Sequence, residues 1–343
     1  MILITGANGF IGSHIAKLLV SQGKRVRGLV RKTGNLSNLK DILPQIELIE
    51  GDILDKASLD KTFKGIEVCL HTAALVRNGN HSSADYFSTN LQGTMNVCEA
   101  AMNAGVKRFV YTSSCETLRT CHCERSEAIP QNKLTAGDCH APSGLAMTAE
   151  TVNSTYSDMV GDYGRSKFLA EEHVKMCVER GFPAIILNPT GVVGAGDVNL
   201  TPPNALLLAY CKGEIPLYFE TGFNVVDVRD VAKAHVMAMT AGKIGERYII
   251  GNSNAMLSQI FKLLDEVSGR RHFSLKIPYF LVGAGMKLAP IKRSWKEKVT
   301  ASKRPFFLDP TKAMNELGWK PEFALKESFK SALLYGVADF SPR

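Results

Sequence analysis

The sequence lacks an apolar run that could cross a lipid bilayer as a helix, which takes about 20 residues. The best candidate, residues 279–289, is interrupted by two glycines and by Lys287. The chain also opens directly on an apolar strand pattern, with no leader segment ahead of it. We therefore expect a cytoplasmic protein that makes at most peripheral contact with membranes.

Signatures of nucleic-acid binding are absent too. The chain has no zinc-finger spacing, no aromatic motif of an RNA-binding sheet and no basic heptads. Its formal net charge is nevertheless +8, which favours an anionic partner such as a phosphorylated cofactor or a nucleotide-linked substrate. Basic residues gather within residues 292–304, where they form either a solvated helix face or a contact for an acidic membrane surface. We expect no nucleic-acid partner.

A clear metal-binding pattern is also missing, although the chain has eight cysteines. Most of them fall in apolar strand and helix patterns, where cysteine behaves as a small buried hydrophobe, so we expect reduced thiols. Cys121, His122 and Cys123 are consecutive, and neighbours in an extended chain point to opposite sides. Because at most two of them can easily reach one ion, a zinc site is the less favoured alternative here, and we predict no metal site.

The segment around these residues, 119–148, shows neither helical nor strand periodicity and interrupts the alternation of strands and helices. Its amino-acid sequence resembles translated bacterial palindromic repeats. We interpret it as an in-frame insertion in a surface loop, because such loops tolerate added length at small entropic cost. We expect the insertion to loop out and leave the chemistry of the chain intact.

What the chain does contain, at its very start, is an apolar strand that leads straight into three glycines. The strand covers residues 2–5, and Gly6, Gly9 and Gly12 precede a helix pattern that extends to residue 23. Glycine lets the backbone turn sharply and approach a pyrophosphate, whose charge then lies at the amide end of the helix. A strand, a glycine turn and a helix in this order predict a dinucleotide-binding site.

Apolar runs alternate with amphipathic stretches through the first half of the chain. This alternation predicts an α/β fold of the Rossmann type, a doubly wound parallel sheet with helices on both faces. We expect strands over residues 2–5, 25–30, 46–50, 68–71, 108–112 and 184–187, and helices over 12–23, 59–63, 86–104 and 163–180.

The rhythm changes after residue 188, where prolines separate shorter segments. We therefore predict an NAD(P)-binding Rossmann domain over residues 1–187 and, over 188–343, mainly a smaller substrate-binding lobe at the carboxyl edge of the sheet. Some segments of the second half are expected to return to the first sheet. The elements that we expect there are strands over 224–228 and 247–250 and a helix over 231–241.

The strongest chemical signal is the pair Tyr163 and Lys167 at the start of a helix pattern. Their spacing places both side chains on one helical face. A phenol titrates near about 10, but a neighbouring ammonium and a bound nicotinamide cation favour the phenolate and lower its pKa. Tyr163 could then exchange a proton with a substrate oxygen. Ser114 follows a buried strand, at the end where this architecture displays catalytic groups.

These motifs resemble those of the extended short-chain dehydrogenases/reductases, and the resemblance covers nearly the whole chain. Within that family the sequence looks most like the hopanoid-associated sugar epimerases and the dihydroflavonol reductase-like proteins. The segments that carry the resemblance are residues 5–12, 51–55, 71–74, 90–94, 111–114, 158–171, 188–190, 221–235 and 247–251.

The resemblance implies roles for the matched positions. Ser114 would bond the substrate oxygen, with Ser113 as its rival. Tyr163 would be the acid/base, and Lys167 would hold the nicotinamide ribose and tune Tyr163. The implied cofactor-binding residues are Gly6, Gly9, Phe10, Ile11 and Gly12 at the pyrophosphate, Asp52 and Ile53 at the adenine, Ala73 at the nicotinamide, and Tyr163, Lys167 and Asn188.

The residues after the second expected strand favour NADP(H). An NAD enzyme usually has a carboxylate there, which binds the ribose hydroxyls and would repel a 2′-phosphate. Here the strand ends in Arg31 and Lys32, with no acid nearby. A guanidinium can bracket a phosphate bidentately, so we predict NADP and regard NAD as the less favoured cofactor.

Three other positions are weaker candidates. We expect His71 to pack and form hydrogen bonds rather than to catalyse. Asn90 is expected to anchor a helix or to orient a water near Lys167. Asp227, Arg229 and Asp230 would form a charged hinge between the lobes, with a substrate phosphate as an alternative partner for Arg229.

Together these features predict an NADP(H)-dependent oxidoreductase that transfers hydride to or from a ketone or carbinol carbon. A nucleotide-sugar epimerase that retains its NAD(P) is the main alternative, because the sequence does not reveal whether the hydride returns to the same substrate. A non-catalytic NADP-binding regulator is the alternative from another class. The expected partner is a small ketone, alcohol or nucleotide sugar, and a homodimer is compatible with these features.

Overall fold

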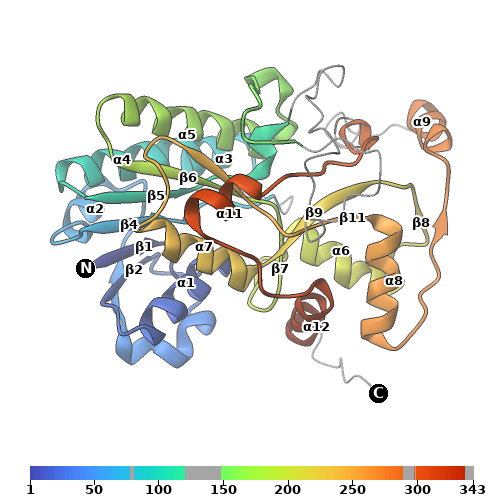
Figure 1. The fold of residues 1–343 in the computed structure, drawn as a ribbon, viewed down its shortest axis with the longest axis horizontal. Helices are drawn as coiled ribbons and strands as arrows, with labels where there is room; N and C mark the ends of the chain where they lie inside the picture. Colours follow the sequence, from blue (N-terminus) through green and yellow to red (C-terminus); the bar gives the residue numbers. More distant parts are fainter. Residues whose placement is uncertain (78–80, 120–147, 289–296, 298, 337–343) are drawn as a thin grey trace.

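The computed structural model of the chain describes residues 1–77, 81–119, 148–288, 297 and 299–336. Almost all of the predicted insertion, residues 120–147, lies outside the described residues. Figure 1 shows a central sheet with helices on both faces and, beside it, a smaller lobe built from the second half of the chain.

The central sheet has seven parallel strands in the order β10-β6-β5-β4-β1-β2-β3. The first six strands along the chain thus lie in the order 3-2-1-4-5-6, which is the Rossmann arrangement. The predicted doubly wound parallel sheet is confirmed, and β10 extends its edge. The strands are β1 (Ile2–Thr5), β2 (Val26–Val30), β3 (Glu47–Glu50), β4 (Val68–His71), β5 (Arg108–Thr112), β6 (Ala184–Pro189) and β10 (Arg247–Ile250).

Alternate strand residues face opposite sides of the sheet and so build two apolar cores. In β1, Ile2 and Ile4 belong to one core and Leu3 to the other. The first core lies under α1 (Phe10–Ser21) and α7 (Val228–Ala238), beside α11 (Thr311–Leu317); the second lies under α2 (Lys56–Thr62), α4 (Gly93–Asn103) and α5 (Gly161–Glu179).

The helix predicted over residues 86–104 is three segments, α3 (Ser83–Tyr86), the π-helical turn η2 (Phe87–Gln92) and α4. Asn90 lies in η2, where its side chain accepts a bond from the Leu75 N–H at 2.7 Å and donates to the Leu75 carbonyl at 3.2 Å. These bonds tie η2 to the loop after β4. Apolar periodicity cannot distinguish a π-helical turn from an α-helix, and such turns are frequent at functional sites.

The smaller lobe has its own sheet and its own core. Its three-stranded sheet has the order β11-β9-β7, and a separate pair joins β12 to β8. The lobe contains β7 (Gly191–Val193), α6 (Pro202–Cys211), β8 (Leu217–Tyr218), β9 (Gly222–Asp227), β11 (Ser253–Met256), α8 (Leu257–Ser268), β12 (Leu275–Lys276), α9 (Tyr279–Leu288) and α12 (Leu325–Gly336). The strand expected over 224–228 is β9. The helix expected from 231 begins at 228, because the Asp227 carboxylate caps it by accepting the Arg229 N–H at 2.8 Å.

Hydrogen bonds fix this lobe beside the carboxyl ends of the central strands. The ring of His14 in α1 bonds the Ala195 carbonyl at 2.9 Å, and the Asn38 amide donates to the Gly196 carbonyl at 2.8 Å. The first contact joins α1, and the second joins the segment after β2, to the loop after β7. In the part of the chain that the structure describes, no helix combines the length and apolarity needed to span a membrane.

Candidate active site

The glycine turn between β1 and α1 approaches a second backbone segment so closely that it requires glycine. Gly6 has φ +68°, and a Cβ there would lie 2.8 Å from the Ala73 Cα. A Cβ on Gly12 would lie 2.3 Å from the Gly6 carbonyl oxygen. Within the described residues no side chain caps α1, and its first turn has no acid. The first amides of α1 are therefore suited to an anion such as a pyrophosphate.

A single cleft of about 660 Å³ runs from this turn towards the smaller lobe. It is lined by seven of the residues predicted from the sequence, Gly6, Gly9, Phe10, Ile11, Gly12, Ser114 and Tyr163. The opposite wall comes from the smaller lobe and from the loop after β6. Its residues include Thr190, Thr221, Asn224 and Leu257. One end of the cleft thus suits a phosphate and the other end is lined by the smaller lobe, with the Ser114 and Tyr163 hydroxyls among the polar groups on its wall.

Ser114 and Tyr163 both line the cleft, and the Ser114 side chain lies near enough to the phenol to lower its pKa. Ser114 follows β5 and caps the 3₁₀ turn η3 (Cys115–Leu118), where its oxygen accepts the Glu116 N–H at 3.2 Å. Tyr163 lies in the first turn of α5. The end of β5 and the start of α5 therefore place these two side chains close together from positions about 50 residues apart.

Burial raises the pKa of Tyr163 to about 12, and the nearby Ser114 side chain only partly opposes that effect. The expected lowering of this pKa by the Lys167 ammonium together with a bound nicotinamide cation stays a prediction, because it concerns the protein with its cofactor. In the protein alone, Tyr163 therefore keeps its proton at neutral pH.

Lys167 is 2% exposed, and its Nζ donates to the Thr112 carbonyl at 2.6 Å. The same atom lies 4.6 Å from the centroid of the Tyr111 ring. Burial lowers the pKa of Lys167 to about 7, while the nearby Glu171 carboxylate acts in the opposite direction. The ammonium therefore titrates near neutrality.

A buried glutamate organises the end of β5. The Glu171 carboxylate accepts bonds from Ser113 at 2.5 Å, Thr117 at 2.8 Å and Asn188 at 3.0 Å. Its other oxygen lies 3.4 Å from Arg247. Ser113 is thus engaged by Glu171, whereas Ser114 faces Tyr163. Sequence reasoning missed Glu171 as a site residue, although its spacing from Lys167 places it on the same face of α5.

Asn188 supports the same turn from β6. It is fully buried, and its amide nitrogen donates to the Ser114 carbonyl and to Thr117, both at 3.0 Å. Among the described residues its Oδ1 has no hydrogen-bond partner. Its expected contact with the cofactor remains a prediction, because Asn188 is not part of the cleft lining.

The other predicted cofactor residues lie outside the cleft lining. Arg31 and Lys32 are exposed directly after β2. The Asp52 carboxylate accepts the Leu54 N–H at 2.9 Å, and Ile53 is buried against Gly93. Ala73 belongs to the backbone segment that touches Gly6. These positions stay predictions for the adenosine and nicotinamide ends of a cofactor.

Charged side chains that were not predicted also line the cleft. Glu116 lies 2.8 Å from Arg119 and 3.6 Å from Arg77. The Arg119 guanidinium also stacks over Phe306 at 4.2 Å from the ring centroid. The contacts of Glu116 with Arg77 and of Arg119 with Phe306 join segments far apart in the sequence, so no local pattern could have indicated them.

The weaker candidates have structural partners. His71 bonds Thr5 at 2.7 Å and Thr94 at 3.1 Å, and burial lowers its pKa to about 3. Arg229 pairs with Asp227 at 2.9 Å and with Glu327 at 2.9 Å. It is not part of the cleft lining, and its role in a hinge stays a prediction.

A parallel Rossmann sheet whose glycine turn opens into a cleft beside a second lobe defines the class, the extended short-chain dehydrogenase/reductase fold. Comparison with known proteins supplies the family. The model of the NAD dependent epimerase/dehydratase family matches residues 2–251, and the chain belongs to that family. The resemblance inferred from the motifs is confirmed.

Relatives include both reductases and epimerases. The chain is 29% identical to a candidate dihydroflavonol 4-reductase of Synechocystis sp., over 96% of this chain and 92% of the relative. The crystal structure of gox2253 is 31% identical with a TM-score of 0.81, covering 98% and 97% of the two chains. A UDP-glucose 4-epimerase of Thermotoga maritima, solved with UDP-glucose, is 25% identical with a TM-score of 0.75, covering 97% of each chain. The chain is therefore an enzyme of an NAD(P)-dependent family.

Proposed function

We propose that the chain is an NADP(H)-dependent reductase that converts a ketone to an alcohol. The observation that carries this proposal is the position of Tyr163 beside Ser114 on the wall of the cleft that begins at the glycine turn. A proton donor and a second hydroxyl side by side are suited to a carbonyl oxygen that becomes an alcohol oxygen.

The residues of the turn fit the cofactor. Gly6, Gly9 and Gly12 let the backbone lie close to a pyrophosphate, and the first amides of α1 would bind it. Lys167 would hold the nicotinamide ribose once its Nζ turns from the Thr112 carbonyl. When bound, the reduced nicotinamide supplies the hydride to the carbonyl carbon, and its oxidised ring adds positive charge near Tyr163.

The proton balance follows from the state of Tyr163. Because its pKa is about 12, the phenol enters the reaction with its proton in place and can donate it to the oxygen of the reduced carbonyl. Ser114 would hold that oxygen through a hydrogen bond. The net change is one ketone, one NADPH and one proton converted to one alcohol and one NADP⁺.

The preference for NADP rests on the end of β2. Arg31 and Lys32 are exposed there, and no acidic residue occurs in the sequence until Asp41, which pairs with Lys17 at 3.5 Å. A carboxylate that would repel a 2′-phosphate is thus missing from this segment, and a guanidinium that can bind one is available. We take this preference as support for net reduction, because a reductase consumes NADPH and releases NADP⁺ in each turnover.

An epimerase is the second candidate. The similarity to a UDP-glucose 4-epimerase over 97% of both chains favours it. In that reaction the hydride returns to the same sugar, so the cofactor stays bound and unchanged overall.

One experiment separates these possibilities. The purified full-length chain is analysed by mass spectrometry for bound NAD or NADP, and then incubated with NADPH or NADH and a panel of ketones and UDP-sugars. We expect NADPH to be consumed in proportion to alcohol formed. Interconversion of UDP-sugars with no change in NADPH would replace the reductase by the epimerase, and binding of NADPH without turnover on either panel would support a regulator.

A further inference from the structure

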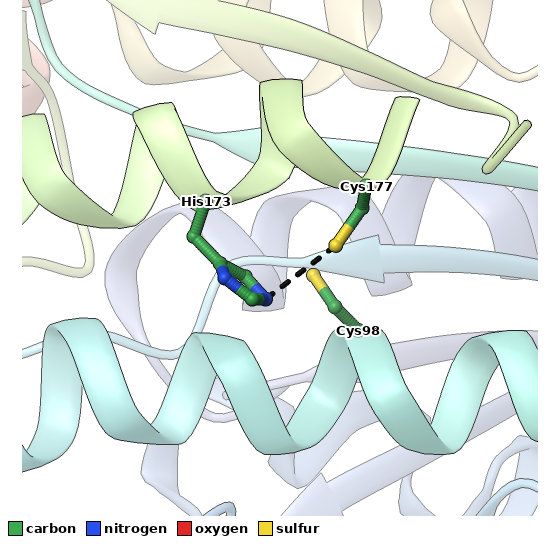
Figure 2. Close-up of side chains that lie close together, drawn as sticks. All are labelled: Cys98, His173 and Cys177. Atoms are coloured by element: carbon green, nitrogen blue, oxygen red, sulfur yellow. Dashed lines mark hydrogen bonds between the residues drawn. The ribbon is translucent and has the colours of Figure 1, made fainter. Parts of the chain in front are cut away.

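Three soft donor atoms meet between α4 and α5, away from the cleft. Figure 2 shows Cys98 on α4 and, one turn apart on α5, His173 and Cys177, with all three side chains directed towards one another. Both cysteines are buried, and His173 is partly exposed. None of the three contributes to the reaction proposed above.

The distances are close to those that a metal ion requires. The Cys177 Sγ lies 3.4 Å from the His173 Nε2, and all three donor atoms lie within 4.8 Å of one another. A tetrahedral zinc ion with bonds of about 2.3 Å to sulfur and about 2.0 Å to nitrogen separates its ligand atoms by roughly 3.6–3.8 Å. The three donors would therefore close up by at most about 1 Å to bind it.

The donor set is selective. In the part of the chain that the structure describes, this is the one group of three His, Cys, Asp or Glu side chains close enough to share an ion. Thiolate sulfur and imidazole nitrogen suit Zn²⁺, whereas Mg²⁺ and Ca²⁺ prefer oxygen. A Cys98–Cys177 disulfide is the competing chemistry, but it would leave unexplained why the His173 ring is directed at the sulfurs.

We propose that Cys98, His173 and Cys177 form a zinc site that clamps α4 to α5. Binding releases the two thiol protons to solvent and forms two Zn–S bonds and one Zn–N bond, without any change of oxidation state. The fourth tetrahedral position is open to a water molecule or an external ligand, and the exposed side of His173 is the route of entry.

The consequence concerns stability rather than the chemistry of the cleft, and it does not depend on the reductase proposal. An ion that binds only the folded chain raises its free energy of unfolding. His173 follows Lys167 by six residues, or about 9 Å along α5. The zinc ion would therefore hold the C-terminal half of α5, whereas Tyr163 and Lys167 lie in its N-terminal half.

The test uses Co²⁺ as a spectroscopic probe of the full-length chain under reducing, oxygen-free conditions. Because Cys121, Cys123 and Cys139 could bind metal independently, the parent for all variants carries serine at these three positions. We expect one Co²⁺ per chain, an intense thiolate-to-cobalt charge-transfer absorption, and displacement of Co²⁺ by Zn²⁺.

Variants of the cluster should remove this signal. We expect Cys98→Ser and Cys177→Ser to weaken Co²⁺ binding by more than about 100-fold, the upper end of the loss seen for residues that merely support a metal ligand. Cys211→Ser, in α6, is the matched control and should leave binding unchanged. If a buried serine prevents folding, His173→Gln keeps the test valid, because this side chain is partly exposed and glutamine preserves much of its volume.

Thermal unfolding of the parent gives an independent readout. Zn²⁺ should raise its melting temperature, and should not raise that of His173→Gln. The proposal is overturned if the parent shows no charge-transfer absorption, if the absorption survives in Cys98→Ser, or if mass spectrometry of the untreated chain finds Cys98 joined to Cys177 and no zinc taken up after reduction.

Discussion

The two helix layers that cover the sheet use their buried polar groups differently. On the α1 and α7 side, His235 bonds the Val231 carbonyl and the Thr112 hydroxyl, both at 2.8 Å, and Trp319 donates to the Asp230 carbonyl at 2.9 Å. These bonds connect neighbouring parts of the scaffold. Each of these groups bonds another buried group, and His235, whose pKa burial lowers to about 4, is not part of the cleft lining, so we assign this layer to stability.

On the α4 and α5 side, the buried groups include an amine and a phenol whose pKa values are far from their usual ranges. Burial lowers the pKa of Lys167 to about 7 and raises that of Tyr163 to about 12. A strongly perturbed group that lines a cleft, as Tyr163 does, is typical of a functional site. Under the proposed function, one face of the sheet therefore carries the chemistry and the other carries stability.

Removing the Tyr163 hydroxyl should produce the largest effect and leave the fold intact. We expect Tyr163→Phe to lower the turnover of NADPH by about 10²–10⁴-fold, because the proton donor is lost, while NADPH affinity and melting temperature stay unchanged. Steady-state kinetics and calorimetry measure these quantities. Tyr86→Phe is the matched control, because Tyr86 packs edge-on against the Tyr163 ring and, among the described residues, its hydroxyl donates to the Val76 carbonyl at 3.3 Å. Equal rate losses in both variants would contradict the assignment.

The opposite layer should give the opposite result. Trp319 is fully buried, so Trp319→Ala leaves a cavity and removes the indole hydrogen bond to the Asp230 carbonyl. We expect the free energy of unfolding to fall by about 3–5 kcal/mol, measured by urea denaturation. Turnover per folded molecule, measured well below the melting temperature, should be retained. A specific loss of turnover with stability unchanged would break the comparison between the layers.

A change in the segment directly after β2 should affect the choice of cofactor only. Arg31→Asp places a carboxylate where a 2′-phosphate would bind, so we expect the ratio of kcat/KM for NADPH to that for NADH to fall by about 10- to 100-fold, as expected for a lost charged hydrogen bond. Lys24→Asp, an exposed change just before the same strand, is the control. An unchanged ratio in Arg31→Asp would show that NADP preference does not depend on this residue.

The smallest expected effect is a pH dependence from Lys167. Its charged form is present below the pKa of about 7 and is lost as the pH rises through that value. We therefore expect the Kd for NADPH to rise up to about tenfold per pH unit above 7, measured by fluorescence titration. Tyr163 stays protonated over this range. Lys167→Arg keeps its charge and should flatten the dependence, and a flat profile in the unmodified chain would refute this role.

The sequence predicted the fold well where the signal is local. The glycine turn, the alternation of strands and helices and the pair Tyr163 and Lys167 each depend on residues close together in the chain, and the observed strands 2–5 and 247–250 have the expected bounds. The three-part segment over residues 83–103 was missed, because the Asn90 bonds that tie its π-helical turn to Leu75 come from another loop.

The remainder of the site depends on contacts between distant segments. Glu171 collects hydroxyl and amide donors from β5, η3 and β6, and Cys98 meets His173 only because α4 packs beside α5. Neither composition nor residue spacing predicts such contacts between distant segments. From the sequence we expect Cys98 and Cys177 to be reduced, buried thiols, and nothing in their spacing pairs them.

Thr112 has a practical consequence for protein engineering. Its side chain bonds His235 on one face of the sheet, and its carbonyl accepts the Lys167 ammonium on the other. A library that seeks heat-resistant variants by repacking α7 would therefore shift the strand residue against which that amine is positioned. Variants selected for melting temperature alone could lose activity through a shift of Thr112. Positions 112 and 235 should therefore be kept unchanged together.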